Sequence, residues 1–164
     1  MSTHATIAYT NGAQCSAIYL HADGDLSFAG ATLLHNYNSK ERAGALVALG
    51  NLSILKERIA PNAKEHHSFD NKVPDVTVAY CRDRGEPLSI QHFADTLLSN
   101  PKSFFMRLAE MSGSNYVYVF DEQRNMWLAG AAFSFTARER EAFPDAKLKT
   151  LYPLRMWFES ITHD

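Results

Sequence analysis

The sequence predicts an α+β fold, a mostly antiparallel sheet of about five strands with helices mainly on one face. Two hairpin patterns carry this prediction. Residues 5–10 and 14–21 are rich in β-branched and aromatic residues and are joined through Asn11-Gly12, a pair typical of tight hairpin turns. Residues 116–120 and 126–135 have the same strand-like composition. Because runs of strands alternate here with consecutive helical patterns, the chain fits the α+β class.

Helices are expected wherever apolar residues recur at the spacing of one helical face behind a capping residue. Such patterns start near Asp25, Ser39, Leu52, Ser89, Asn100 and Pro153. The one after Ser39 is expected to end at Gly50, where glycine can adopt the left-handed conformation. The one near Leu52 is only a short turn that stops before Pro61.

A long loop and a buried strand follow these first helices. Residues 61–74 have no apolar period and are bracketed by prolines, and a loop of this length in a compact domain is either functional or poorly ordered. Residues 76–81 are apolar on both alternating faces, which predicts the central strand of the sheet. Phe69 is expected to fold the loop back onto the domain.

The composition favours one domain spanning residues 1–164 and located in the cytoplasm. The chain is 46% hydrophobic and 21% charged, typical of a soluble globular protein. Its formal net charge of −2 makes nucleic-acid binding through a basic surface unlikely. No membrane span or signal peptide is expected. Cys15 and Cys81 match no metal-binding spacing, so two reduced, buried thiols are the simplest interpretation.

The densest group of charges lies at the end of the predicted central strand, in Tyr80-Cys81-Arg82-Asp83-Arg84-Gly85-Glu86. Arg82 and Arg84 could offer paired donors to phosphate or carboxylate, with Asp83 or Glu86 orienting them or acting as a base. The alternative is a turn whose charges neutralise one another. Tyr80 would adjoin either arrangement, so it is a further candidate for binding a ligand or partner.

Two other polar clusters could complete a site with these arginines. His21 and Asp23 lie two residues apart after a strand, a spacing that suits two metal ligands or a histidine oriented by an acid. The alternative is a polar pair satisfied at a helix N-terminus, which is the commoner arrangement. His66, His67 and Asp70 lie in the long loop. No catalytic role is assigned by a motif, and the candidates are His21, Asp23, Asp83 and Glu86. No metal site is predicted, since two ligands do not make one, and no cofactor is indicated because phosphate-loop, zinc-peptidase and hydrolase motifs are missing from the sequence.

In these elements the sequence resembles a set of small uncharacterised proteins encoded by tailed phages and prophages. The shared elements are Met1 to Ile7, Ile18-Tyr19-x-His21-x-Asp23-Gly24, Leu33-Leu34-x-x-Tyr37, Ala48 to Ser53, the loop ending in Phe69-Asp70, Ala79 to Glu86, and Tyr116 to Tyr118 with Trp127. The set usually carries an aromatic residue before the Asp-Gly pair and a tyrosine after it, where this chain has Ala22 and Asp25. The resemblance does not extend to residues 89–111 or beyond Phe133.

The resemblance implies a phage or prophage accessory protein that acts in the bacterial cytoplasm by binding a host protein, as an inhibitor of a host or defence enzyme. The exposed loops 61–74 and 82–87 are the expected contact surface. The competing interpretation is a small phosphate- or nucleotide-binding enzyme or sensor, in which the arginines hold an anion beside His21 or a loop histidine. A structural virion protein that assembles through a sheet edge is a third possibility.

Overall fold

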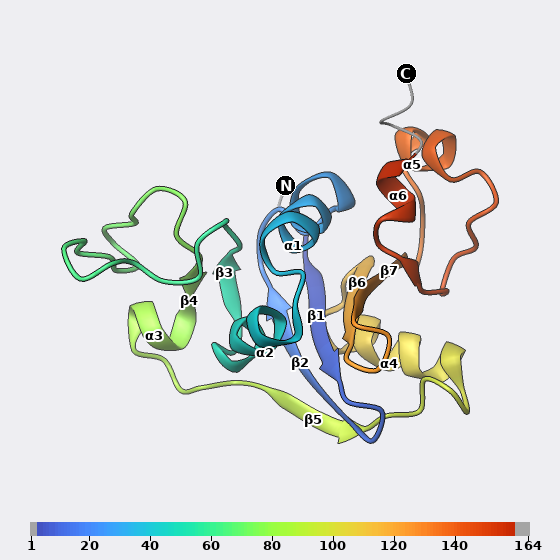
Figure 1. Cartoon of the computed structure of the whole chain (residues 1–164), viewed down its shortest axis with the longest axis horizontal. Helices are drawn as coiled ribbons and strands as arrows, with labels where there is room; N and C mark the ends of the chain where they lie inside the picture. The colour runs from blue at the N-terminus through green and yellow to red at the C-terminus, as the bar shows by residue number, and fades with distance from the viewer. Residues whose placement is uncertain (1–2, 160–164) are drawn as a thin grey trace.

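The computed structural model describes residues 3–159 and contains both predicted hairpins. Strands β1 (Ala5–Thr10) and β2 (Gln14–Leu20) pair antiparallel, as do β6 (Tyr116–Asp121) and β7 (Met126–Ala131). These four strands form the centre of the molecule (Figure 1). Their strong β composition and short turns make them local structures, which is why the sequence predicts them well.

The sheet is larger and more mixed than predicted. It has eight strands in the order β4-β3-β2-β1-β6-β7-β8, with β5 pairing beside β2. The added strands are β3 (Leu52–Ile54), β4 (Val78–Ala79), β5 (Gln91–Ala94) and β8 (Tyr152–Pro153). The α+β class is confirmed, but the prediction of a mostly antiparallel sheet of about five strands is wrong, since the sheet has eight strands among the described residues and is mixed, with β1–β6 and β2–β3 as parallel pairs.

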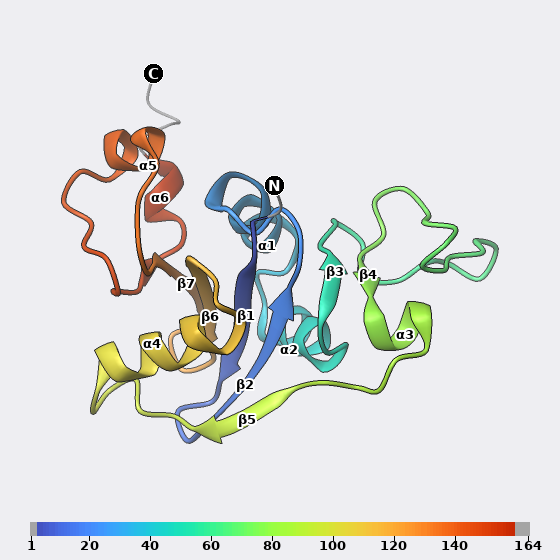
Figure 2. The same cartoon turned by 180° about the vertical axis from the view of Figure 1, so that it is seen from behind.

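Helices cover both faces of the sheet. Along β6, Tyr118 and Phe120 point into one core while Val117 and Val119 point into the other. The first core also takes residues of the π-helix η1 (Leu26–Gly30) and of α1 (Ala31–Asn36), α2 (Lys40–Ala48) and α6 (Met156–Glu159). The second is closed by α4 (Pro101–Ser112), which lies behind the sheet in Figure 1 and in front of it in Figure 2. The sequence predicts helices mainly on one face of the sheet. The structure corrects this for α4, which covers the opposite face.

Two predicted helix caps are confirmed. Ser39 accepts a hydrogen bond from the Arg42 N–H at the start of α2, and Asn100 accepts one from the Ser103 N–H at the start of α4. These side chains satisfy donors that the first turn of a helix leaves without a partner. The remaining helices are α3 (Tyr80–Arg84) and α5 (Ala137–Ala142).

Three predicted elements are corrected by the structure. The turn predicted near Leu52 is strand β3, and the helix predicted after Ser89 is strand β5. The predicted central strand 76–81 contains only the two-residue β4, at one end of the sheet order, and its last residues begin α3. Each of these segments is short, so its conformation depends on the strand with which it pairs. Strands β3 and β5 pair with β2, and β4 pairs with β3. Ile161, expected in the last helix, lies outside the described residues.

Both cysteines are free, Cys15 buried in β2 and Cys81 half-buried in α3. Between residues 3 and 159, no helix combines the length and the apolar character that crossing a bilayer requires.

Gly44 offers a direct check on how α2 packs. A Cβ atom built there would meet only Tyr9 Cε2, at an ordinary contact distance of 3.8 Å. We expect Gly44→Ala to raise the free energy of unfolding by about 0.5–1 kcal/mol, because alanine loses less backbone entropy than glycine in a helix. Urea unfolding followed by circular dichroism measures this change. A destabilised variant would contradict the packing of α2 against β1.

Candidate functional site

Residues 55–87, here called the lobe, project from the β3–β4 end of the sheet (Figure 1). Apart from β4, α3 and an isolated bridge between Arg58 and Val76, the lobe has no regular secondary structure. The predicted loop 61–74 is confirmed within it. Loops of this size are held in place only if side chains supply the hydrogen bonds that regular structure would otherwise make.

Arg82 connects separate segments of the lobe through its guanidinium. Its Nη1 donates to the Ile59 carbonyl oxygen at 2.5 Å, its Nη2 to the Thr77 carbonyl oxygen at 2.7 Å, and its Nε to Asp83 Oδ1 at 2.9 Å. The guanidinium fork thus joins the loop, the strand before α3 and a carboxylate. With its donors used in this way, Arg82 acts as a structural clamp and is not free to hold an anion.

Asp83 is the acceptor at the centre of this arrangement. Its Oδ2 accepts hydrogen bonds from the Ala79 N–H at 2.7 Å and from Arg82 Nη2 at 3.0 Å. Burial by itself would raise the pKa of the carboxyl, but the hydrogen bonds from Arg82 and Ala79 outweigh it and hold the pKa below its ordinary value. The backbone carbonyl of Asp83 also accepts from the Phe69 N–H at 2.9 Å, which attaches the loop to α3.

His67 is the buried histidine of the loop, with 0% of its side chain exposed. Its Nδ1 accepts a hydrogen bond from the Val73 N–H at 3.0 Å, so this imidazole is neutral and carries its proton on Nε2. Nε2 lies 3.3 Å from Asp83 Oδ2, yet it is not aligned for a hydrogen bond with any described residue. The contact is therefore electrostatic. His66 and Asp70, the other loop candidates, are exposed.

The outer part of the loop is fixed by a second ion pair. Arg58 donates to both oxygens of Glu65, at 2.7 and 2.9 Å. The hydrogen bonds from Arg58 and from the Asn62 backbone lower the pKa of Glu65 to about 2. The loop therefore has polar anchors at both its base and its tip.

Above these anchors lies a cluster of aromatic and cationic side chains, here called the Phe69 cluster. It consists of Phe69, Lys72, Tyr80 and Arg84. The Phe69 and Tyr80 rings stack with centroids 5.8 Å apart, and the Arg84 guanidinium lies 4.3 Å from the Phe69 centroid and 4.9 Å from that of Tyr80. Lys72 Nζ lies 4.8 Å from the Phe69 centroid. Phe69 thus folds the loop onto α3, as the sequence predicts.

Arg84 is more exposed than Arg82, whose side chain is 27% exposed, and no hydrogen bond to a backbone carbonyl of the described residues holds it in the lobe as those of Arg82 do. Its side chain is 47% exposed and donates to Glu86 Oε2 at 2.6 Å. Arg84, Glu86 and Tyr80 line a cavity of 290 Å³ together with Tyr19, Asn51, Cys81, Pro87 and Ser89. This cavity lies between α3 and β2 and brings the charged segment next to the first hairpin.

Tyr19 connects this cavity to His21. The Tyr19 hydroxyl lies 2.8 Å from His21 Nδ1 and 2.9 Å from His4 Nδ1, and the two imidazoles stack with centroids 5.0 Å apart. Burial and the neighbouring Tyr80 raise the pKa of Tyr19, so its hydroxyl stays protonated. His21 therefore reaches the cavity only through Tyr19. Asp23 sits in an exposed turn with a φ of 55°.

Neither His4 nor Tyr19 was recognised as a site residue from the sequence. The register of the first hairpin indicates the proximity of these residues. Because Ala5 pairs with Leu20, His4 lies opposite His21. Tyr19 and His21 are two residues apart and so share a face of β2. The register of this hairpin therefore predicts that His4, Tyr19 and His21 lie together.

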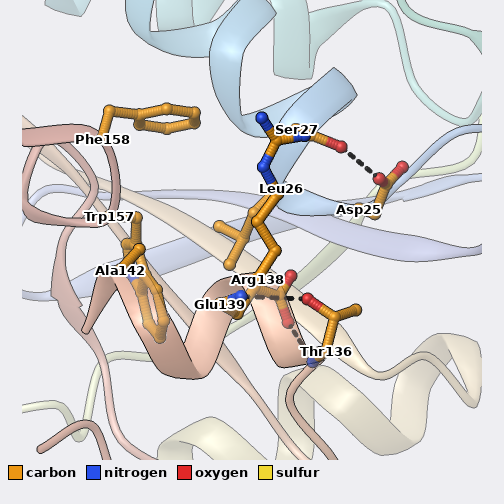
Figure 3. A pocket seen from close by; sticks show the side chains of 9 residues that line it. All are labelled: Asp25, Leu26, Ser27, Thr136, Arg138, Glu139, Ala142, Trp157 and Phe158. Carbon is orange, nitrogen blue, oxygen red and sulfur yellow. Dashed lines mark hydrogen bonds between the residues drawn. The ribbon is translucent and has the colours of Figure 1, made fainter. Parts of the chain in front are cut away.

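A cavity of 340 Å³ lies elsewhere, between η1, α5 and α6 (Figure 3). Its carboxylates already serve the fold. Glu139 accepts from the Tyr116 hydroxyl at 2.9 Å and from the Thr136 N–H at 2.9 Å, and Asp25 accepts from the Ser27 hydroxyl at 2.7 Å. Arg138 extends from α5 toward η1 across this cavity. Burial and the Glu139 carboxylate raise the pKa of Tyr116 well above its ordinary value, consistent with a packing role.

Across residues 3–159, no three histidine, cysteine or carboxylate side chains converge as a metal centre would require. A scan against protein-family models, a search of curated proteins and a search of solved structures each found no match for the chain. The class of protein is therefore described from its fold and its candidate site. It is an α+β protein with a mixed sheet and a lobe whose loops are fixed by internal ion pairs.

Proposed function

We propose that the chain is an accessory protein of the phage or prophage type that acts in the bacterial cytoplasm by binding a host protein and inhibiting a host or defence enzyme. The lobe is the contact surface. One observation carries the proposal: a long exposed loop without regular structure is held in a single arrangement by the Arg82–Asp83 clamp and the buried His67.

Such an arrangement suits binding because a rigid loop loses little conformational entropy when it meets its partner. A solvent-exposed loop that only connected β3 to β4 would need no interior ion pairs. The anchors of the lobe lie beneath its surface, at Asp83 and His67, while the exposed side chains above them stay free for contact. Two of the elements that resemble the phage set, Phe69-Asp70 and residues 79–86, lie in these segments.

The Phe69 cluster supplies the chemistry of a contact site. Tyrosine and arginine are enriched among the residues that dominate protein–protein affinity, because they combine a large apolar area with donors. Here the Arg84 guanidinium lies over two rings, so it is positioned before any partner arrives. Lys72 adds a second cation beside Phe69.

The proposal predicts that tagged wild-type protein retains a specific host protein from bacterial lysate, and that Arg84→Ala and Phe69→Ala each lose it. We expect each substitution to weaken the complex by about 2 kcal/mol, or about thirtyfold in Kd. The retained protein is identified by mass spectrometry, and its Kd is then measured with purified components by titration calorimetry.

Arg140→Ala is the matched control, since Arg140 is an exposed arginine on α5, at the far end of the molecule from the lobe (Figure 1). It should leave retention unchanged. Arg82→Ala is unsuitable as an interface variant because it would release the clamp. Equal retention by wild type, Arg84→Ala and Phe69→Ala would rule out the lobe as the contact surface.

The 290 Å³ cavity favours a second candidate, a small phosphate- or nucleotide-binding enzyme or sensor. Tyr19, Tyr80 and Arg84 line that cavity and carry donors suited to an anion. The Glu86 carboxylate, 2.6 Å from Arg84, opposes this function because an anion must compete with it for the guanidinium. This competition is why protein binding is the first choice.

Thermal unfolding in the presence of inorganic phosphate and a panel of nucleotides separates the two candidates. A ligand that binds only the folded chain adds RT ln(1 + [L]/Kd) to its stability and so raises Tm, by an amount that grows with the logarithm of the ligand concentration. The first proposal expects no shift. A shift that disappears in both Arg84→Ala and Tyr19→Phe would favour the sensor or enzyme instead.

A further inference from the structure

A groove at the other end of the molecule combines apolar and cationic side chains and has no part in the lobe. Its volume is 600 Å³, and it lies between the start of α4, the β6–β7 turn and the segment 147–151. Figure 1 shows α4 and β7 on the opposite side of the central strands from α3. Its lining residues are Leu97, Leu98, Pro101, Lys102, Arg124, Leu128, Lys147, Leu148, Lys149, Thr150 and Leu151.

The charge of this groove has one sign. Four of its lining residues are lysine or arginine, and among the described residues that line it none is aspartate or glutamate. The whole chain, in contrast, has 16 basic and 18 acidic residues. Arg124 is balanced by Asp121 at 3.5 Å. For Lys102, Lys147 and Lys149, no carboxylate in the described part of the chain forms an ion pair.

The position of Lys102 adds to the positive potential. It lies in the first turn of α4, a helix with no acidic residue there, although the helix dipole favours negative charge at that end. The positive end of the helix dipole repels the Lys102 ammonium, so lysine at this position destabilises the protein when no ligand is bound. An anionic group in the groove would meet both the lysine and the positive end of the dipole.

The backbone beneath the cations is firmly placed. Lys149 has a φ of 60°, and its N–H donates to the Ala131 carbonyl at 2.8 Å. Next to it, the Thr150 carbonyl packs so closely on Gly130 that a Cβ atom there would lie 2.1 Å from the oxygen. A left-handed lysine costs energy that the surrounding contacts must offset. The cations of segment 147–151 are therefore presented from a fixed frame.

The floor and rim of the groove are apolar. Leu128 is buried, while Leu98 is 79% exposed and Leu148 is 40% exposed. Exposed leucines around a concave site indicate contact with apolar side chains of a partner. Since no aromatic residue between positions 3 and 159 lines the groove, this part of the chain offers no stacking platform of the kind by which proteins hold nucleic-acid bases.

We propose that this groove binds an acidic peptide segment of a partner protein, with Asp or Glu side chains on Lys102, Lys147 and Lys149 and apolar side chains between Leu98 and Leu148. The inference is independent of the lobe and goes beyond the proposed function. A concave groove fits a peptide better than a membrane surface, which requires protruding apolar residues. Charge complementarity of this kind also speeds association and weakens with added salt.

The test uses fluorescein-labelled peptide libraries in which Asp or Glu alternates with Leu, Ile or Phe, and matched libraries with Lys in place of the acid. Fluorescence anisotropy should detect binding of the acidic library alone, with affinity falling as salt is added. We expect Lys102→Glu and Lys149→Glu each to weaken binding about tenfold, the scale of one lost charge contact. Leu98→Ala should weaken it severalfold, without affecting the fold because Leu98 is exposed.

Lys64→Glu is the control, because Lys64 is exposed in the lobe and the charge change is identical. The inference is overturned if no acidic peptide binds, or if Lys64→Glu weakens binding as much as Lys149→Glu. Binding of a labelled oligonucleotide or of phosphatidylserine vesicles in preference to the peptides, lost in the same lysine variants, would reassign the groove to that partner.

Discussion

Asp83→Ala is expected to lower the free energy of unfolding by about 3 kcal/mol, because it removes a carboxylate whose side chain is only 4% exposed and which accepts several hydrogen bonds. The substitution removes the acceptor for both Arg82 and the Ala79 N–H. It also removes the carboxylate that lies 3.3 Å from the buried His67. Urea unfolding measures the loss, and hydrogen exchange should show faster exchange of the amides of residues 59–79.

Asp70→Ala is the matched control, since it removes an exposed carboxylate of the same loop. A surface substitution of this kind should change stability by less than about 0.5 kcal/mol. If the two variants lost similar stability, the Arg82–Asp83 clamp would not be what holds the lobe.

The same pair predicts the direction of a pH effect. Folding lowers the pKa of Asp83, so its contribution to stability is complete above the ordinary carboxyl pKa and is lost as pH falls through the lowered, folded pKa. The stability difference between wild type and Asp83→Asn should therefore shrink on acidification below that ordinary pKa. A difference that stayed constant down to strongly acidic pH would contradict the ion pair.

Gly130→Ala is expected to destabilise the protein by about 3 kcal/mol, because the new Cβ has no room. It would lie 2.1 Å from the Thr150 carbonyl oxygen and 2.9 Å from Phe105 Cε2. Either segment 147–151 moves away from β7 or α4 shifts, and both movements alter the cationic groove. Urea unfolding and the peptide anisotropy assay would record the two consequences together.

Gly113→Ala provides the comparison for that variant. Gly113 has a φ of 61° at the end of α4, and a Cβ there would meet nothing within 4 Å. The cost should be about 1 kcal/mol, from the left-handed backbone alone. Equal destabilisation by the two substitutions would show that Thr150 does not pack on Gly130.

Elements whose signals are local were predicted correctly. The pair Asn11-Gly12 and the strand-like residues around it produce the first hairpin, and Ser39 and Asn100 cap the helices they precede. In each case the residues that decide the conformation are neighbours in the chain, and so their spacing contains the information.

Elements whose conformation depends on a distant partner were missed. Residues 91–94 have helical spacing of apolar residues, yet they pair with residues 14–17 of β2. Strand β1 lies parallel to β6, more than half the chain away. The unpaired backbone groups of a strand edge impose such pairings, and a periodicity count over a few residues contains no information about them.

The candidate site shows the same division. The sequence indicates Asp83 and His67 as members of polar clusters, and Phe69 as the residue that folds the loop back. It does not indicate the partners of Arg82, because the backbone carbonyls of Ile59 and Thr77 have no sequence signature. Arg82 and Arg84 are two residues apart and look alike in the chain. Only their surroundings make one a clamp and leave the other exposed.

The sequence by itself determined the α+β class, the two hairpins, the capped helices and the concentration of charge in residues 80–86. The tertiary structure alone decided which strands are parallel, which arginine donates to backbone carbonyls, and that Lys102, Arg124 and residues 147–149 share one groove. The physical reason is the range of the interactions. Turn, cap and alternation preferences act between neighbouring residues, whereas ion pairs with backbone carbonyls and strand-edge pairing are established only when distant segments meet.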